Sequence, residues 1–312
     1  AWARRLEVDA ASERDAVRAD RLSVAAVLPL TEALRLRLST VQARQRAGTV
    51  RATGLPAFGT LAADDRAAEA RLLARPDRAL GVELTLGLRE AERRFATASL
   101  SATAQVLARL QVQAGVELNA RATESPALAV AGRRDELRLG ADLRLSATEP
   151  LRVTLRTGRL SLQDGTSLGT LSALEWEAAH LLRGATPELR LRAFGQYVRT
   201  RAADGPLPGW TARLAPDGSL PGASFFVPES HALHGIGLSA GLADRDGPAR
   251  AWRPFVDLSL TRHSRLGTGW SATVGAAGRL FGSDRWQVQY STTRAGSAGD
   301  ARSIGMRYLL PF

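Results

Sequence analysis

Ser303-Ile304-Gly305-Met306-Arg307-Tyr308-Leu309-Leu310-Pro311-Phe312 is the end of the chain and the stretch that decides its fold class. Counted back from the terminal phenylalanine, every second residue is large and apolar, and most of the residues between are small or polar. A period of two is that of a β-strand with one face in an apolar medium and the other in a wetter one. The chain therefore stops in an amphipathic strand, on its apolar face.

The spacing of a glycine and two hydrophobes in this stretch resembles the closing strand of bacterial outer-membrane β-barrels. Gly305, Tyr308, Leu310 and Phe312 match the signal that the barrel-assembly machinery reads in such strands. The resemblance implies the bacterial outer membrane as location, with that machinery and outer-membrane lipids as partners. An ordinary amphipathic strand at the end of a soluble sheet would alternate in the same way, so the rest of the chain has to decide.

The same alternation runs through the whole chain. In residues 80–88, five apolar side chains share one face and Gly81, Glu83, Thr85 and Gly87 the other. Segments 33–41, 108–121 and 137–145 repeat the pattern clearly, as do several segments between 151 and 290, and weaker alternation occurs near 4–11, 20–28, 68–75 and 93–104. The sequence thus predicts an all-β fold, a transmembrane antiparallel β-barrel of about sixteen strands. Residues 1–312 form this single domain.

Composition agrees with that fold class. With 23% charged and 45% hydrophobic residues and no cysteine, the chain is too polar for a helical membrane protein and too apolar for disorder. It contains no apolar run of roughly 18 residues, and its start lacks the apolar core of a signal peptide. Because a barrel must be exported, we expect a mature chain or part of a longer protein.

The net charge of +11 comes almost entirely from arginine. A basic patch would suggest nucleic acid, but these arginines alternate with leucines along the whole length instead of clustering. We therefore predict no nucleic-acid partner.

Connections of two kinds alternate along the chain. Short turns are predicted at 29–32, 75–78, 148–150 and 282–284, and long Gly/Pro/Ala-rich loops at 47–67 and 201–230. Short turns on one side and long loops on the other are typical of outer-membrane barrels, and place both termini in the periplasm. Residues 64–75 also suit a helix by propensity; a strand there keeps the strand number even, with a short helix as the alternative.

One face of the predicted wall carries arginines and carboxylates and points into the lumen. The predicted lumen and substrate path consists of Arg35, Arg37, Glu83, Arg109, Glu117, Arg138, Asp142, Arg144, Arg152, Arg156, Glu175, Glu177, Arg190, Arg192 and Asp257. These side chains either pair across neighbouring strands and stiffen the wall, or set what passes through a water-filled channel. Arginines outnumber carboxylates by a handful, so the sequence predicts a weakly anion-selective channel with local acidic patches.

The loop 201–230 is too rich in Gly and Pro for long strands, yet it carries large apolar side chains that are costly to leave in water. We predict that it folds inward, buries Trp210, Leu214, Leu220, Phe225 and Phe226, and gates the pore, with Arg213 as a reporter of its exposure.

Catalysis and metal binding are not predicted. His231 and His234 have a spacing that would bring two ligands together on a helix, but they lie where a loop becomes a strand, with no cysteine or obvious carboxylate beside them. No nucleophile motif accompanies any histidine. We expect neither enzyme activity nor a cofactor.

Strand number, chain length and the C-terminal signal together resemble the outer-membrane barrel of exopolysaccharide secretion proteins. Residues 225–239, in which Pro228 ends a loop and Gly235 and Gly237 thin the following strand, are similar to the loop-to-strand passage of Pel-type exporters. The resemblance implies a passive conduit for a secreted polysaccharide. It also implies that a periplasmic tetratricopeptide-repeat scaffold precedes the barrel in a longer chain, with periplasmic scaffold or polymer-modifying proteins as partners.

Alternatives remain at this point. Export barrels for cellulose and poly-N-acetylglucosamine are nearly as similar, and a cationic polymer would prefer a more acidic lumen than the one predicted. A general or weakly anion-selective porin is the second function, and a soluble all-β binding protein the least favoured.

Overall fold

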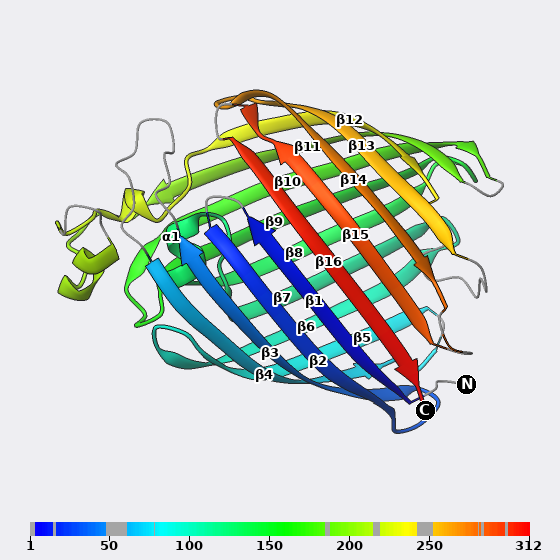
Figure 1. Cartoon of the computed structure of the whole chain (residues 1–312), viewed down its shortest axis with the longest axis horizontal. Coiled ribbons are helices and arrows are strands. Elements are labelled where there is room, and N and C mark those ends of the chain that lie inside the picture. The colour runs from blue at the N-terminus through cyan, green and yellow to red at the C-terminus, as the bar shows by residue number, and fades with distance from the viewer. Residues whose placement is uncertain are drawn as a thin grey trace.

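The computed structural model is a closed barrel of antiparallel strands (Figure 1). It describes residues 4–14, 17–47, 61–77, 79–184, 188–214, 219–241, 252–279, 281, 284–296 and 299–312. The strands are β1 (Arg5–Arg14), β2 (Val17–Pro29), β3 (Leu34–Ala47), β4 (Leu61–Ala74), β5 (Leu80–Glu90), β6 (Arg94–Leu107), β7 (Leu110–Arg121), β8 (Gly132–Arg144), β9 (Pro150–Leu162), β10 (Ser167–Arg183), β11 (Leu189–Ala202), β12 (His231–Ala240), β13 (Arg253–His263), β14 (Gly267–Gly278), β15 (Arg285–Arg294) and β16 (Asp300–Pro311). The predicted fold class is confirmed.

The C-terminal strand closes the barrel by pairing with β1 on one side and β15 on the other. Tyr308 lies opposite Val8 and Leu310 opposite Leu6, so the apolar residues of the two strands share the outer face. Phe312 follows on the same face, 67% exposed, and its backbone N–H donates to the carbonyl of Arg4 at 3.0 Å. The closing strand thus has the register that its alternation predicts.

The two faces of the wall differ in chemistry. Large apolar side chains stand exposed on the outside, among them Leu84, Leu86, Leu137, Leu139, Leu258 and Leu260. The residues between them line the interior, for example Glu7, Arg37, Arg71 and Arg307. Rows of exposed leucine are unfavourable in water and favourable in hydrocarbon. The barrel is therefore built to sit in a membrane with a wet lumen.

Residues 64–74 belong to strand β4, although the propensity of segment 64–75 suits a helix. β4 pairs with β3 and β5, and its backbone groups are satisfied by those neighbours. Tertiary pairing outweighs intrinsic propensity here. The predicted loop 47–67 is correspondingly wrong at its end, because the strand already begins at Leu61 and places Asp64 and Asp65 in the wall; residues 48–60 lie outside the described residues.

Both termini lie at one end of the barrel, which we call the terminal end; the opposite end is the distal end (Figure 1). The connections at 30–33 and 145–149 are short and lie at the terminal end, as predicted; the turns at 75–78 and 282–284 also join strands there but lie partly outside the described residues. The prediction of short turns at one end of the barrel and long loops at the other is only partly right. Distal connections such as 163–166 and 264–266 are short, whereas β12 and β13, which meet at the terminal end, are separated by twelve residues, of which 242–251 lie outside the described residues.

In the part of the chain that the structure describes, helices occur only in the connections. α1 (Pro126–Ala131), η1 (Gly209–Leu214) and η2 (Ala223–Phe225) are the helices of the described chain, and all three lie at the distal end. Among the described residues no helix is long and apolar enough to cross a membrane.

Candidate functional site

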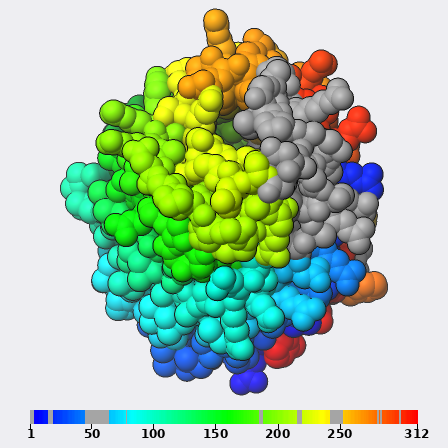
Figure 2. Space-filling view, turned by 90° about the vertical axis from the view of Figure 1, so that its left-hand side faces the viewer, coloured from blue at the N-terminus to red at the C-terminus, as the bar shows by residue number. Residues whose placement is uncertain are grey.

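Two distal connections fold into the lumen. We call α1 together with residues 203–214 and 219–230 of the β11–β12 connection the plug. Figure 2 shows the distal end, where the yellow-green atoms of the β11–β12 connection spread across the middle of the barrel mouth. The plug is the first part of the candidate site, since it lies where a pore would open.

Local sequence explains why α1 forms inside the β7–β8 connection. The Ser125 hydroxyl caps the helix by accepting a hydrogen bond from the backbone N–H of Leu128 at 3.2 Å, and Pro126 occupies the first turn, where no N–H is needed. The same hydroxyl donates to the Phe226 carbonyl at 2.5 Å. The cap therefore also joins the two halves of the plug.

A hydrophobic core holds the plug against the inside of the wall. Phe226 is 0% exposed, and Leu128 and Leu214 are buried beside it. The wall side of this core consists of Leu160, Leu162, Leu168, Leu171, Ala173 and Val198, on β9, β10 and β11. Each large side chain buried in this way stabilises the folded state by roughly 1.5–3 kcal/mol.

The sequence signal for this core is a change along β9. Its inward positions are Arg152 and Arg156 in the first half, but Leu160 and Leu162 at the distal end. A wall that met only water would have continued with polar residues. This switch could have predicted that something apolar covers the distal part of β9.

Polar contacts fasten the plug to neighbouring turns. The Trp210 indole donates to Asp164 Oδ2 at 2.8 Å, and Arg213 forms an ion pair with Glu92. Asp164 belongs to the β9–β10 turn and Glu92 to the β5–β6 turn, so η1 is tied to two separate hairpins. Partial burial works to raise the pKa of Asp164, but hydrogen bonds from Thr166 and Trp210 outweigh it and leave this pKa below its ordinary value.

The predicted gating-loop residues divide in two groups. Phe226 lies inside the core, and Trp210 and Phe225 pack at its edge. Leu220 is 58% exposed, so the prediction that it is buried is wrong. Residues 215–218 lie outside the described residues.

The charges on the inner wall are largely paired with one another. Glu136, 3% exposed, lies at the centre of the largest group, with Arg138 Nη2 at 2.8 Å, Arg156 Nη1 at 3.3 Å and Arg134 Nε at 3.5 Å from its carboxylate. Sequence reasoning missed Glu136 and Arg134 because the strand was expected to begin at 137, whereas β8 begins at Gly132. Extending the alternation backwards from Arg138 would have found both.

A second buried ion pair, between Arg89 and Asp65, was also not predicted from the sequence. Arg89 donates twice to Asp65, at 2.7 and 2.5 Å, and Arg121 Nε lies 3.7 Å from the same carboxylate. Asp65 had been assigned to a loop, which removed it from the predicted lumen. Two parallel bonds between a guanidinium and a carboxylate are among the stronger polar contacts in proteins.

Most of the predicted lumen residues take part in such pairs. The N···O distances are Arg37–Glu7 3.0 Å, Glu83–Arg71 3.4 Å, Glu117–Arg134 3.4 Å, Asp142–Arg152 2.5 Å, Glu175–Arg156 2.7 Å, Glu177–Arg192 3.5 Å, Asp257–Arg192 2.6 Å and Arg190–Glu188 2.8 Å. Arg35 lines the same interior, and Arg144 ends β8. The prediction that Arg109 lines the lumen is wrong. Arg109 lies in the tight turn between β6 and β7 and is exposed, because β7 begins only at Leu110.

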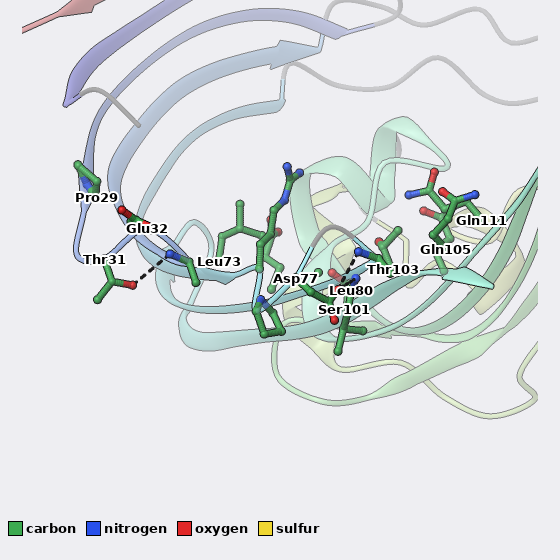
Figure 3. A pocket seen from close by; sticks show the side chains of 17 residues that line it. Pro29, Thr31, Glu32, Leu73, Asp77, Leu80, Ser101, Thr103, Gln105 and Gln111 are labelled. Atoms are coloured by element: carbon green, nitrogen blue, oxygen red, sulfur yellow. Dashed lines mark hydrogen bonds between the residues drawn. The ribbon is translucent and has the colours of Figure 1, made fainter. Parts of the chain in front are cut away.

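A recess of about 1250 Å³ lies at the terminal end of the lumen (Figure 3). We call it the terminal vestibule. Its polar wall comes from β6 and β7, with Ser101, Thr103, Gln105, Gln111 and Gln113, and its rim from the turns that carry Glu32 and Asp77. Sequence reasoning about charged rows passed over these uncharged side chains.

The histidines do not form one ligand set. His231 stacks on His263 with ring centroids 4.6 Å apart, whereas His234 contacts Tyr197 on the outer face. Residues three apart on a strand point to opposite faces, which separates His231 from His234. Within the described ranges, no cluster of three or more His, Asp or Glu side chains has the geometry to hold a metal ion.

Known proteins resemble this chain in sequence family and in fold. The family model described as "PelB, C-terminal beta barrel domain" matches residues 2–310. Comparison with curated protein sequences gave no match. Among solved structures, one described as "Bacterial polysaccharide outer membrane secretin" is similar with a TM-score of 0.67 and 10% identity, covering 99% of this chain and 98% of that one. Pseudomonas aeruginosa OccK3 (OpdO) is similar with a TM-score of 0.51 and 11% identity, over 99% and 94%. At these identities the structural likeness shows the fold alone.

Proposed function

We propose the function of this chain from one premise: it belongs to the family of PelB C-terminal beta barrel domains. It is an outer-membrane β-barrel, and its function is that of a channel through which a polysaccharide is exported. The observation that carries this conclusion is the family match over residues 2–310. The polysaccharide secretin among the structural neighbours agrees with it.

The lumen supports transport better than it supports chemistry. Its inner wall is polar, and most of its charges are bonded to one another, so they do not converge on a reacting group. We propose a passive conduit without catalysis, in which synthesis of the polymer inside the cell supplies the driving force.

The plug is the proposed gate. It occupies the distal mouth with a compact apolar core, and it is fastened to two hairpins by single polar contacts. We propose that the terminal end faces the periplasm and that the plug opens towards the outside. A scaffold of tetratricopeptide repeats preceding the barrel in a longer chain, and periplasmic polymer-modifying proteins, are partners that this orientation would accommodate.

The C-terminal strand is the proposed assembly signal. Tyr308, Leu310 and Phe312 form an outward apolar row beside the seam with β1, accessible from the membrane side. We propose that the barrel-assembly machinery reads this row together with Gly305.

Transport is tested in liposomes loaded with two fluorescent solutes, a disaccharide and a linear polysaccharide fragment. A variant in which residues 205–227 are replaced by two glycines is compared with the unmodified barrel. Release of both solutes by the shortened variant supports polysaccharide export. Release of the disaccharide alone would support the second function, a general porin.

A further inference from the structure

Three arginines on the outer face of the barrel have no partner in the described part of the protein. Arg159, Arg199 and Arg201 lie at the distal ends of β9 and β11, and each of them is exposed. Their outward direction follows from their neighbours, because Leu160 and Val198 belong to the hydrophobic core inside the barrel and side chains alternate along a strand. Among the described residues, none of the three guanidinium groups has a hydrogen bond or an ion pair.

The register of β9, β10 and β11 brings these arginines together. On one rung Arg159 lies opposite Thr170, and Thr170 lies opposite Arg201. On the next rung towards the terminal end, Arg199 lies opposite Ser172. Strands are about 4.8 Å apart and alternate residues of a strand about 7 Å apart, so the three guanidinium groups can reach one headgroup. We call the six outward residues of these two rungs the arginine patch: Thr157, Arg159, Thr170, Ser172, Arg199 and Arg201.

The same three strands are apolar on the terminal side of the arginine patch. The next outward rung consists of Leu155, Leu174 and Tyr197, of which Leu155 is 53% and Tyr197 46% exposed. The rung after it continues with Val153 and Trp176. The patch therefore lies at the distal edge of the outer apolar band, where the hydrocarbon of a bilayer gives way to its headgroups.

The carboxylates near the arginine patch do not engage its arginines. Asp135 on β8 lies opposite Arg159, but its Oδ1 accepts a hydrogen bond from the backbone N–H of Asn119 at 2.7 Å. Asp204 follows the end of β11. Within the ranges that the structure describes, neither carboxylate forms an ion pair with an arginine of the patch. The patch thus keeps free N–H donors at the edge of the apolar band.

We propose that the arginine patch binds a phosphate-bearing glycolipid of the outer leaflet, with a phosphate on the guanidinium groups and the acyl chains along the apolar rungs. Arginine suits phosphate because its planar fork of N–H donors matches the phosphate oxygens and is more weakly hydrated than an ammonium group. The hydroxyls of Thr170 and Ser172 supply further donors and acceptors for the headgroup.

Other occupants fit this surface less well. The wall of the barrel separates the arginine patch from the lumen, so the exported polymer does not meet it on its way through. A symmetric contact with a second copy of the chain would place these arginines against one another, and like charges repel.

The inference goes beyond polysaccharide export, because it concerns the outer face of the wall. It rests on the proposed orientation, in which the distal end faces the outside. The chain has no cysteine, so Arg265→Cys in the β13–β14 turn at the distal end gives a single site for a membrane-impermeant maleimide. Labelling in intact cells supports this orientation. Labelling only after the outer membrane has been permeabilised would overturn the orientation and the inference with it.

The main experiment measures lipid binding to the barrel in nonionic detergent micelles by native mass spectrometry. Three lipids are compared: lipid A with both of its phosphates, lipid A from which both phosphates have been removed, and phosphatidylglycerol. The test variant combines Arg159→Gln, Arg199→Gln and Arg201→Gln, which removes three charges and keeps polar side chains.

The chain offers a matched control on β3, β4 and β6. Arg44, Arg66 and Arg94 are also exposed at the distal ends of their strands, but they have carboxylates beside them. Arg44 Nε is 3.9 Å from Asp64, and Glu90 lies opposite both Arg66 and Arg94. Changing these three arginines to glutamine removes the same charge from a surface that has its own countercharges.

We expect the unmodified barrel to bind the phosphorylated lipid A more tightly than either other lipid. The patch variant should lose roughly tenfold or more of this affinity, because hydrogen bonds between charged groups are stronger than neutral ones. The control variant should bind as the unmodified barrel does. Circular dichroism verifies that each variant has folded, and Arg199→Gln alone should give a smaller loss in the same direction.

Three results of this experiment would overturn the inference: equal binding of the phosphate-free lipid A, an equal loss in the control variant, or equal or tighter binding of phosphatidylglycerol. The liposome experiment separates such a failure from that of the proposed function. If the plug-shortened barrel releases the polysaccharide but the patch variant binds lipid A normally, export stands and the arginine patch is wrong. If the patch variant loses lipid A as expected but the polysaccharide is never released, the arginine patch stands and export is wrong.

Discussion

At the scale of single residues, the lumen shows that charge on a barrel wall is mainly structural. Glu136 has three arginines around it and almost no exposure, whereas Asp142 pairs with Arg152 near the terminal end, where the arginine side chain is mostly exposed. Ion pairs of these two kinds differ in their contribution to stability, because the environment decides how much water screens them.

Glu136→Gln is therefore expected to destabilise the barrel strongly. It leaves Arg134, Arg138 and Arg156 around a neutral amide, and breaking a buried ion pair from one side costs about 3–5 kcal/mol. Asp142→Asn is the control, with an expected loss of at most about 1 kcal/mol. Urea unfolding in detergent measures both; equal losses would contradict the distinction.

Acid should release η1 through Asp164. Because the folded-state pKa of this group lies below the ordinary value of 3.8, its contribution is complete at neutral pH and is lost as the pH falls through the folded pKa. We expect tryptic cleavage after Arg213 in a pH-pulsed sample to rise only after exposure below about 3.8. Asp164→Asn should raise cleavage already at pH 7 and flatten the acid dependence; an unchanged acid profile would argue against this anchor.

At the scale of elements, the strands were predictable and the plug only in part. Alternation located β5, β7 and β16 closely, because each strand has a lipid face and a lumen face along most of its length. It shortened β8, whose first residues lie under α1 and have apolar and charged neighbours alike. It gave no sign of α1, since a six-residue helix held by one serine cap has too little periodicity to detect. The uncharged residues that line the terminal vestibule were not predicted, because only charged side chains were considered as lumen residues.

The plug should open when its core is weakened. Phe226→Ala removes a large buried side chain, and such a substitution costs about 3–5 kcal/mol, enough to shift a small element from closed to open. Leu220→Ala, in the same connection but at an exposed position, is the matched control and should change nothing. Planar-bilayer recordings measure the result as new conductance steps, and their absence in Phe226→Ala would mean that the plug is not the gate.

At the scale of the whole molecule, the plug and the terminal vestibule lie at opposite ends of the lumen. The plug is packed against β9, β10 and β11 on one side of the wall, while Gln111 and Gln113 of the vestibule lie on β7. The field in the lumen is the sum of many matched pairs with a small excess of arginine, so we expect weak selectivity for anions that fades with salt.

Reversal potentials across a salt gradient, measured on the plug-shortened barrel, check that expectation. Arg192→Gln should shift the potential towards cations, because it leaves Asp257 and Glu177 without their guanidinium. Arg294→Gln, an exposed arginine 3.9 Å from Asp300 near the distal rim, should leave the potential unchanged. Clear cation selectivity of the unmodified pore would show that the lumen is not net basic.

The seam between β1 and β16 has a consequence for the order of events in the life of the chain. Arg307 donates to Asp9 across 298 positions of sequence, and every rung of that seam joins the start of the domain to its end. No rung of the seam can form before β16 has been synthesised, and until then two strand edges stay open to foreign partners. Closure of the barrel therefore waits for the strand that is made after the other fifteen. A chain that lacks only β16 would keep the edges of β1 and β15 open.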